Sequence, residues 1–122
     1  MTKASEKAKQ DNVYSDVEEK RIQLEEKYKC KVKAAIFKAS QDDEPCVVYF
    51  RPATTFTKMQ CMDMAAQSAM KASRILFEAT VIREASDQRA FQQDNDNDFY
   101  YLGAIKFCGE MVTYARNTLK KN

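Results

Sequence analysis

The stretch FTKMQCMDMAAQSAMKASRILFEATVIR, residues 56–83, decides the fold, because its apolar and small residues recur in alternating steps of three and four. The first seam comprises Met59, Met62, Ala66, Ala69, Ser73, Leu76 and Thr80, and the second comprises Cys61, Ala65, Ser68, Ala72, Ile75, Ala79 and Ile82. An ordinary surface helix has one apolar face of about 100°. The pattern therefore predicts one long helix that needs packing partners on two sides.

A second helix of the same kind is predicted from about residue 99 to residue 119. Its two seams are Tyr101, Ile105, Cys108, Val112, Ala115 and Leu119, and Tyr100, Ala104, Phe107, Met111 and Tyr114. Two wide apolar helices with little else to cover them indicate a surface that binds protein. The residues predicted to contact a partner are Met59, Met62, Ala66, Ala69, Leu76, Phe107, Met111 and Tyr114.

The segment before these helices predicts a charged helix and a β-hairpin. Residues 1–12 are polar and are expected to form a flexible tail, with residues 13–122 as a single domain. A charged helix is expected from Val13 to Lys29, docked by one narrow edge. Its edge residues are Val13, Val17, Leu24 and Tyr28. Alternation over residues 32–37 and the apolar run 46–50 predict two antiparallel strands.

The predicted fold class is therefore α+β: an N-terminal charged helix, a two-stranded antiparallel hairpin and two long packed helices. A lone two-stranded ribbon is marginal in water, so the hairpin must lie against a helix or pair with strands of another copy. Either Thr54 or Thr55 can cap the helix that follows the hairpin.

Composition narrows the class of protein. The chain has 122 residues, net charge +2, two Gly and two Pro, which favours long helices over a many-stranded sandwich. The first 20 residues contain no apolar signal segment, and no apolar run is long enough to span a membrane, so a cytoplasmic location is expected. The four cysteines, Cys30, Cys46, Cys61 and Cys108, are too scattered for a zinc site and are predicted to be reduced, mostly buried thiols.

The sequence contains no catalytic or cofactor signature. There is no His to serve as a base, and with Gly103 and Gly109 as the only glycines no phosphate-binding loop can be written. Asp94, Asp96 and Asp98 mimic the start of a calcium loop, but the required Gly and Glu positions hold Phe99 and Ile105. These observations predict no enzyme, no metal and no cofactor.

The best nucleic-acid candidate is a run of lysines at the end of the first helix and along the first strand. It comprises Lys27, Lys29, Lys31, Lys33 and Lys38, with Tyr28 and Phe37 interleaved. A nucleic-acid-binding domain usually carries a strongly basic face, which a net charge of +2 does not provide. The solvated side of a strand explains these lysines better than binding to nucleic acid does.

The order of these elements resembles a known group of small proteins. A charged helix ends in Leu24-Glu25-Glu26-Lys27-Tyr28, the second strand ends in Val48-Tyr49-Phe50-Arg51-Pro52-Ala53, and a long helix, an acidic turn and a closing helix follow. This is similar to the tail-assembly chaperones of tailed bacteriophages over roughly residues 20–120. The turn at residues 94–98 is longer and richer in Asn than is typical of that group.

The resemblance implies a non-enzymatic protein that covers apolar helical surface of a client in the host-cell cytoplasm, with self-association into a homo-oligomer expected. Two alternatives remain open. A structural virion subunit in a ring or lattice would use the same seams permanently, and its hairpin could add strands across copies. A small nucleic-acid-associated regulator would use the lysine run instead.

Overall fold

The computed structural model describes residues 3–111, and side chains from residue 12 onward. Four α-helices and a two-stranded antiparallel hairpin confirm the α+β prediction. The elements are α1 (Lys3–Tyr28), β1 (Lys33–Phe37), β2 (Cys46–Phe50), α2 (Thr55–Ala65), α3 (Ala69–Thr80), the 3-10 helix η1 (Gln88–Phe91) and α4 (Phe99–Met111). The predicted second strand matches β2 at both ends.

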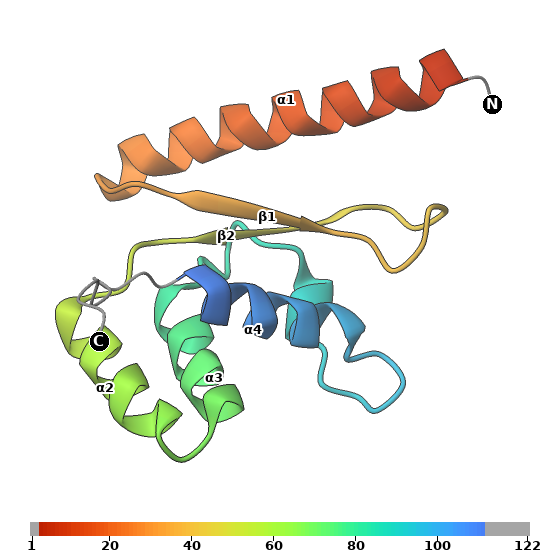
Figure 1. Cartoon of the computed structure of the whole chain (residues 1–122). Helices are drawn as coiled ribbons and strands as arrows, with labels where there is room; N and C mark the ends of the chain where they lie inside the picture. Colours follow the sequence, from red (N-terminus) through yellow and green to blue (C-terminus); the bar gives the residue numbers. More distant parts are fainter. Residues whose placement is uncertain (1–2, 112–122) are drawn as a thin grey trace, which may run out of the picture.

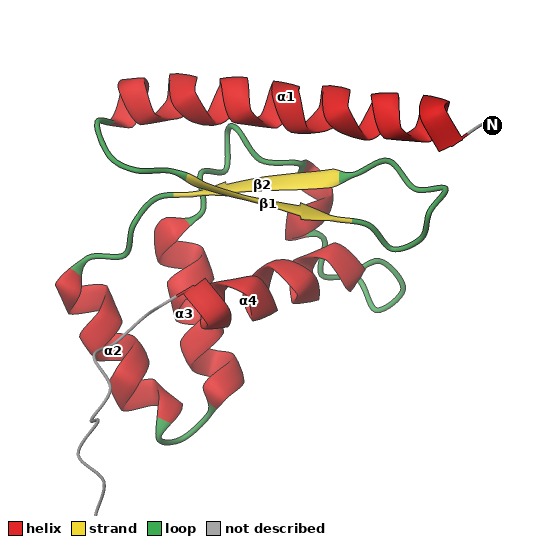
Figure 2. Cartoon of the chain, turned by 45° about the horizontal axis from the view of Figure 1, so that its top comes forward, coloured by secondary structure: helices red, strands yellow, loops and turns green. Residues whose placement is uncertain are grey.

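The hairpin lies between α1 on one face and α2, α3 and α4 on the other (Figures 1 and 2). Alternation along the strands explains why both faces can be covered. Ala35 pairs with Val48, and both point into the core shared with the three helices. The next pair, Ala34 with Tyr49, points toward α1 instead. The hairpin thus gains the packing that an isolated ribbon lacks.

The chain after α3 runs along the outer edge of β2. Phe50 forms a bridge with Val81, and the Ile82 amide donates to the Tyr49 carbonyl at 2.8 Å. Further along, the Asp87 amide donates to the Val47 carbonyl at 2.9 Å. The hydroxyl of the buried Ser86 accepts from the Tyr49 amide at 3.0 Å. These bonds satisfy backbone groups of β2 that would otherwise be left without partners.

The prediction of one helix over residues 56–83 is wrong, because the chain breaks into α2 and α3. Ser68 is extended, with φ −159° and ψ 114°, and its hydroxyl caps α3 by accepting from the Lys71 amide at 3.2 Å. A straight helix of this length would span roughly 42 Å, against roughly 17 Å for a five-residue strand. The break lets α3 lie under the short β-hairpin, while α2 folds back and packs against α3. Thr54 caps α2, as one of the two predicted options.

The ends of the outer helices also differ from prediction. Helix α1 begins at Lys3, so its backbone continues through most of the segment expected to be a tail. It ends at Tyr28, and the next residue, Lys29, adopts a left-handed conformation with φ 55°. Such a residue commonly terminates a helix. Helix α4 begins at Phe99 as predicted, and the part predicted beyond Met111 lies outside the described residues.

Aromatic rings fill the core on the α2–α4 side. Phe77 is fully buried and contacts Phe50, Phe91 and Tyr101, with ring centroids 6.3, 5.8 and 5.7 Å apart. Phe50 also lies 5.3 Å from Phe107 of α4. Because these rings come from β2, α3, η1 and α4, one cluster joins most of the elements on this side.

Candidate protein-binding surface

Helix α2 turns a row of large apolar side chains away from the core. Phe56, Met59 and Met62 are 70%, 59% and 54% exposed, whereas Cys61 is 5% exposed. At about 100° per residue, Phe56 and Met59 lie on the side of the helix opposite Cys61, and Met62 lies at the edge of that side. Ala66, also exposed, continues the row one turn later. We call Phe56, Met59, Met62 and Ala66 the α2 outer face.

The structure divides the predicted partner-contacting residues into two groups. Met59, Met62, Ala66 and Ala69 are exposed on the α2–α3 hairpin. Leu76 is 2% exposed in the core, so its assignment to a binding surface is wrong: the break at Ser68 turns this side of α3 toward the hairpin.

The residues predicted on the last helix do not extend the α2 outer face. Phe107 and Met111 are half-buried against the core, and Tyr114 lies outside the described residues. Over residues 12–111, the predicted seams therefore do not form one continuous exposed surface. The exposed members gather on α2 and at the start of α3.

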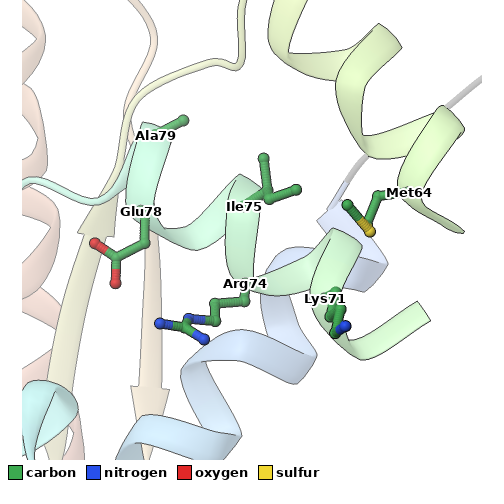
Figure 3. A pocket seen from close by; sticks show the side chains of 6 residues that line it. All are labelled: Met64, Lys71, Arg74, Ile75, Glu78 and Ala79. Atoms are coloured by element: carbon green, nitrogen blue, oxygen red, sulfur yellow. The ribbon is translucent and has the colours of Figure 1, made fainter. Parts of the chain in front are cut away.

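A groove lies on the solvent side of the α2–α3 hairpin (Figure 3). Its lining comes from Met64 of α2 and from Lys71, Arg74, Ile75, Glu78 and Ala79 of α3. Met64 and Ile75 are half-buried and point into the space between the two helices, and charged side chains from α3 flank them. We call this set the α2–α3 groove. Sequence reasoning missed it because Lys71, Arg74 and Glu78 belong to neither of the predicted apolar seams.

The charges around the groove are not balanced. Glu78 forms an ion pair with Arg83 at 2.7 Å. Lys71 and Arg74 have no carboxylate partner among the described residues. The groove therefore combines an apolar floor with two cations that are available to an acidic ligand.

A second exposed region, which carries acidic side chains, comprises the loop before α4 and the first turn of that helix. Asp94 and Asp96 are exposed, and neither they nor Asp98 has an ion-pair partner in the described part of the chain. Phe99 is 59% exposed and Leu102 is 44% exposed. We call Asp94, Asp96, Asp98, Phe99 and Leu102 the acidic knob.

The lysine run contains little that could stack on a base. All five lysines are exposed. However, Phe37 packs edge-on against Phe107 at 6.2 Å, and Tyr28 lies against the Arg51 guanidinium at 5.2 Å. Single-stranded nucleic acid is usually held by accessible aromatic rings beside basic residues. The two rings that made the run attractive are instead engaged with the protein.

Three of the four cysteine side chains are buried, and burial raises the pKa values of their thiols. Cys46, Cys61 and Cys108 are buried, as predicted, and all four cysteines are free. Burial raises the pKa of the Cys46 thiol to about 11 and that of the Cys108 thiol to about 12. Thiols with raised pKa values are poor nucleophiles near neutral pH. Across the described part of the chain, no three side chains of metal-binding type are grouped to hold an ion.

The hairpin loop is held in place by a polar cluster around Arg89. Its guanidinium donates to the Glu44 and Pro45 carbonyls, both at 3.0 Å, and to the Asp87 carboxylate at 2.9 Å. Arg89 also holds the pKa of the Asp87 carboxyl below its ordinary value. Tyr100 lies under the guanidinium at 4.7 Å. The bonds to the Glu44 and Pro45 carbonyls join the loop to η1, and the Tyr100 ring connects the cluster to α4.

Comparisons with protein-family models, with curated proteins and with solved structures find no match for this chain. Over the described residues, no helix combines the length and the apolar character needed to cross a bilayer.

Proposed function

We propose that this chain is a non-enzymatic protein-binding protein whose α2 outer face covers an apolar helical surface of a client. The observation that carries this proposal is the exposure of Phe56, Met59 and Met62 on a helix whose opposite side already packs into the core. Methionine side chains adapt to irregular partner surfaces, which suits a protein that must bind and release.

The spacing of the face favours a helical client. Phe56, Met59, Met62 and Ala66 follow each other at intervals of three and four residues, the spacing of ridges that pack into grooves of another helix. Burial of each large side chain contributes about 1.5–3 kcal/mol. Ala66, being small, would allow the client backbone to approach closely at one end of the face.

The narrower form of the proposal is an assembly chaperone of a tailed bacteriophage, acting in the host cytoplasm. This form comes from the resemblance carried by residues 24–28 and 48–53. A structural virion subunit would bury the same face permanently and is the alternative within the same class.

Two single substitutions, one on the α2 outer face and one away from it, test the proposal. Met62→Asp adds a carboxylate to the outer face and should abolish capture of the client from a lysate of phage-infected host cells. Gln23→Asp adds the same charge at an exposed position of α1 and should leave capture unchanged. Circular dichroism must show equal helix content in both variants. Equal client capture by Met62→Asp and the wild type would overturn the proposal.

Light scattering during size exclusion, with thiols kept reduced, then separates the two forms of the proposal. Ala69→Glu changes a second exposed position, at the start of α3, and can be measured in the same way as Met62→Asp. A chaperone should release its client on dilution, because binding must be reversible. A permanent subunit should remain in a large assembly of fixed mass, since obligate interfaces bury a larger apolar area.

A further inference from the structure

The α2–α3 groove has the chemistry of a site for an acidic, partly apolar segment. Met64, Ile75 and Ala79 supply its apolar lining, and Lys71 and Arg74 flank this lining. Elsewhere in the described chain, the guanidinium groups of Arg21, Arg83 and Arg89 are each paired with a carboxylate. Lys71 and Arg74 are thus distinguished as cations that lie beside an apolar groove without a carboxylate partner.

The acidic knob has the complementary chemistry. Asp94, Asp96 and Asp98 bring three carboxylates to one loop and the residue before α4. Directly after them, Phe99 and Leu102 expose large apolar side chains on the first turn of the helix. The spacing of three places these two side chains near one another on the helix surface. Carboxylates beside an exposed apolar pair match cations beside an apolar groove.

The two regions belong to different ends of the helical layer. Figures 1 and 2 draw the loop before α4 at one end of this layer and α2 at the other, with α3 between them. The knob therefore lies far from the α2 side of the groove. Contact between them requires a second copy.

We propose that copies of this chain associate head to tail, with the acidic knob of one copy docked in the α2–α3 groove of the next. The knob carboxylates would face Lys71 and Arg74, and Phe99 and Leu102 would cover Met64 and Ile75. A contact between two different surfaces repeats from copy to copy and gives a ring or an open filament. It also leaves the α2 outer face available to a client, because that face uses other residues.

Two charge-reversed variants test the contact. The groove variant, Lys71→Glu/Arg74→Glu, keeps a working knob, and the knob variant, Asp94→Lys/Asp96→Lys, keeps a working groove. Asp98 is left unchanged because it directly precedes α4, where a negative side chain is favourable and a positive one is not. Lys31→Glu/Lys33→Glu, at exposed positions on the hairpin side, controls for reversing two charges. Circular dichroism establishes that each variant folds.

Light scattering at low salt gives the readout. The wild type and the Lys31/Lys33 control should form species larger than a monomer, and each reversed variant alone should be monomeric. An equimolar mixture of the two reversed variants should again form species larger than a monomer, because the acidic knob of the groove variant fits the basic groove of the knob variant, and the reversed knob fits the reversed groove. Added salt should dissociate these species, since exposed charges are screened.

Three results would overturn the proposal. They are a wild type that stays monomeric up to its solubility limit, a groove variant that assembles like the wild type, and a mixture of the two variants that stays monomeric. Client capture through the α2 outer face is measured separately, with Met62→Asp. Loss of self-association therefore leaves the proposed function untouched, and the reverse also holds.

Discussion

The two faces of the hairpin are covered in different ways. On the α2–α4 side, fifteen buried apolar residues form one cluster, with Phe50, Phe77 and Tyr101 in direct contact. On the α1 side, the buried set among the described residues is only Val17, Leu24, Val32, Tyr49 and Ile82. The free energy of folding must therefore come mainly from the α2–α4 side, because burial of apolar area is the dominant stabilising contribution.

Polar contacts supplement the thin α1 side. The Lys20 ammonium donates to the Ala85 carbonyl at 2.9 Å and lies 5.4 Å from the Tyr49 ring centroid. The Glu25 carboxylate accepts from the Val32 amide at 2.9 Å. These contacts fix where α1 lies but bury little area. Helix α1 therefore covers one face of the hairpin through a narrow row of contacts, whereas the α2–α4 layer contributes most of the buried apolar residues.

Phe77→Ala should produce the largest loss of stability. Removing a fully buried ring that contacts three other aromatic rings should lower the free energy of unfolding by about 3–5 kcal/mol. Urea denaturation followed by circular dichroism measures the change. Phe56→Ala, at a position 70% exposed, is the control and should shift stability by no more than about 0.5 kcal/mol. Equal losses in the two variants would contradict the assignment of the main core.

Leu24→Ala should cost less, at about 2–3 kcal/mol, because α1 can settle onto the hairpin around the vacated space. The stronger expectation concerns where the structure opens. Hydrogen exchange should accelerate in the amides of α1 and stay unchanged in those of α3 and α4, since α1 can detach as a local unit. Uniform acceleration across all helices would show that α1 and the α2–α4 layer unfold together.

How far the sequence predicts this fold depends on the range of the interactions involved. The alternation before residue 37 and the run Cys46–Phe50 are local patterns, and the strands form where these patterns predict them. The break at Ser68 was missed, because Ser68 also fits a helical seam and no Gly or Pro marks the turn. The shortness of the hairpin disfavours a single long helix, and that is a tertiary effect.

The residues of the candidate surface were predicted only in part, because their exposure depends on the same break at Ser68. Met59, Met62, Ala66 and Ala69 are exposed, whereas Leu76 belongs to the core once α3 is an independent helix. Residues 81–83 were predicted as the end of the long helix, and residues 84–98 only as a polar connection after it. The role of this segment beside β2 depends on backbone bonds such as Ile82 to Tyr49, which leave no periodic pattern in the sequence.

Of the three substitutions, Asp87→Asn should lower the free energy of unfolding least. It probes the segment after α3 that runs along β2. Arg89 holds the pKa of Asp87 below its ordinary value, so the folded state is favoured by the ionised carboxylate. This contribution is present above the unfolded pKa, near 4, and is lost as the pH falls through the lower folded pKa. Near pH 7 the variant should lose about 1 kcal/mol, because the amide still accepts from the Arg89 amide but carries no charge.

The pH dependence distinguishes this charge effect from a simple packing defect. Urea denaturation of the wild type and of Asp87→Asn, at constant ionic strength, should show a stability gap that narrows as the pH is lowered toward about 3. A packing defect would leave the gap constant, because the Asn side chain does not titrate. Arg89 would in either case retain its bonds to the Glu44 and Pro45 carbonyls. A constant gap would therefore mean that the Asp87 charge does not help Arg89 hold the hairpin loop against η1.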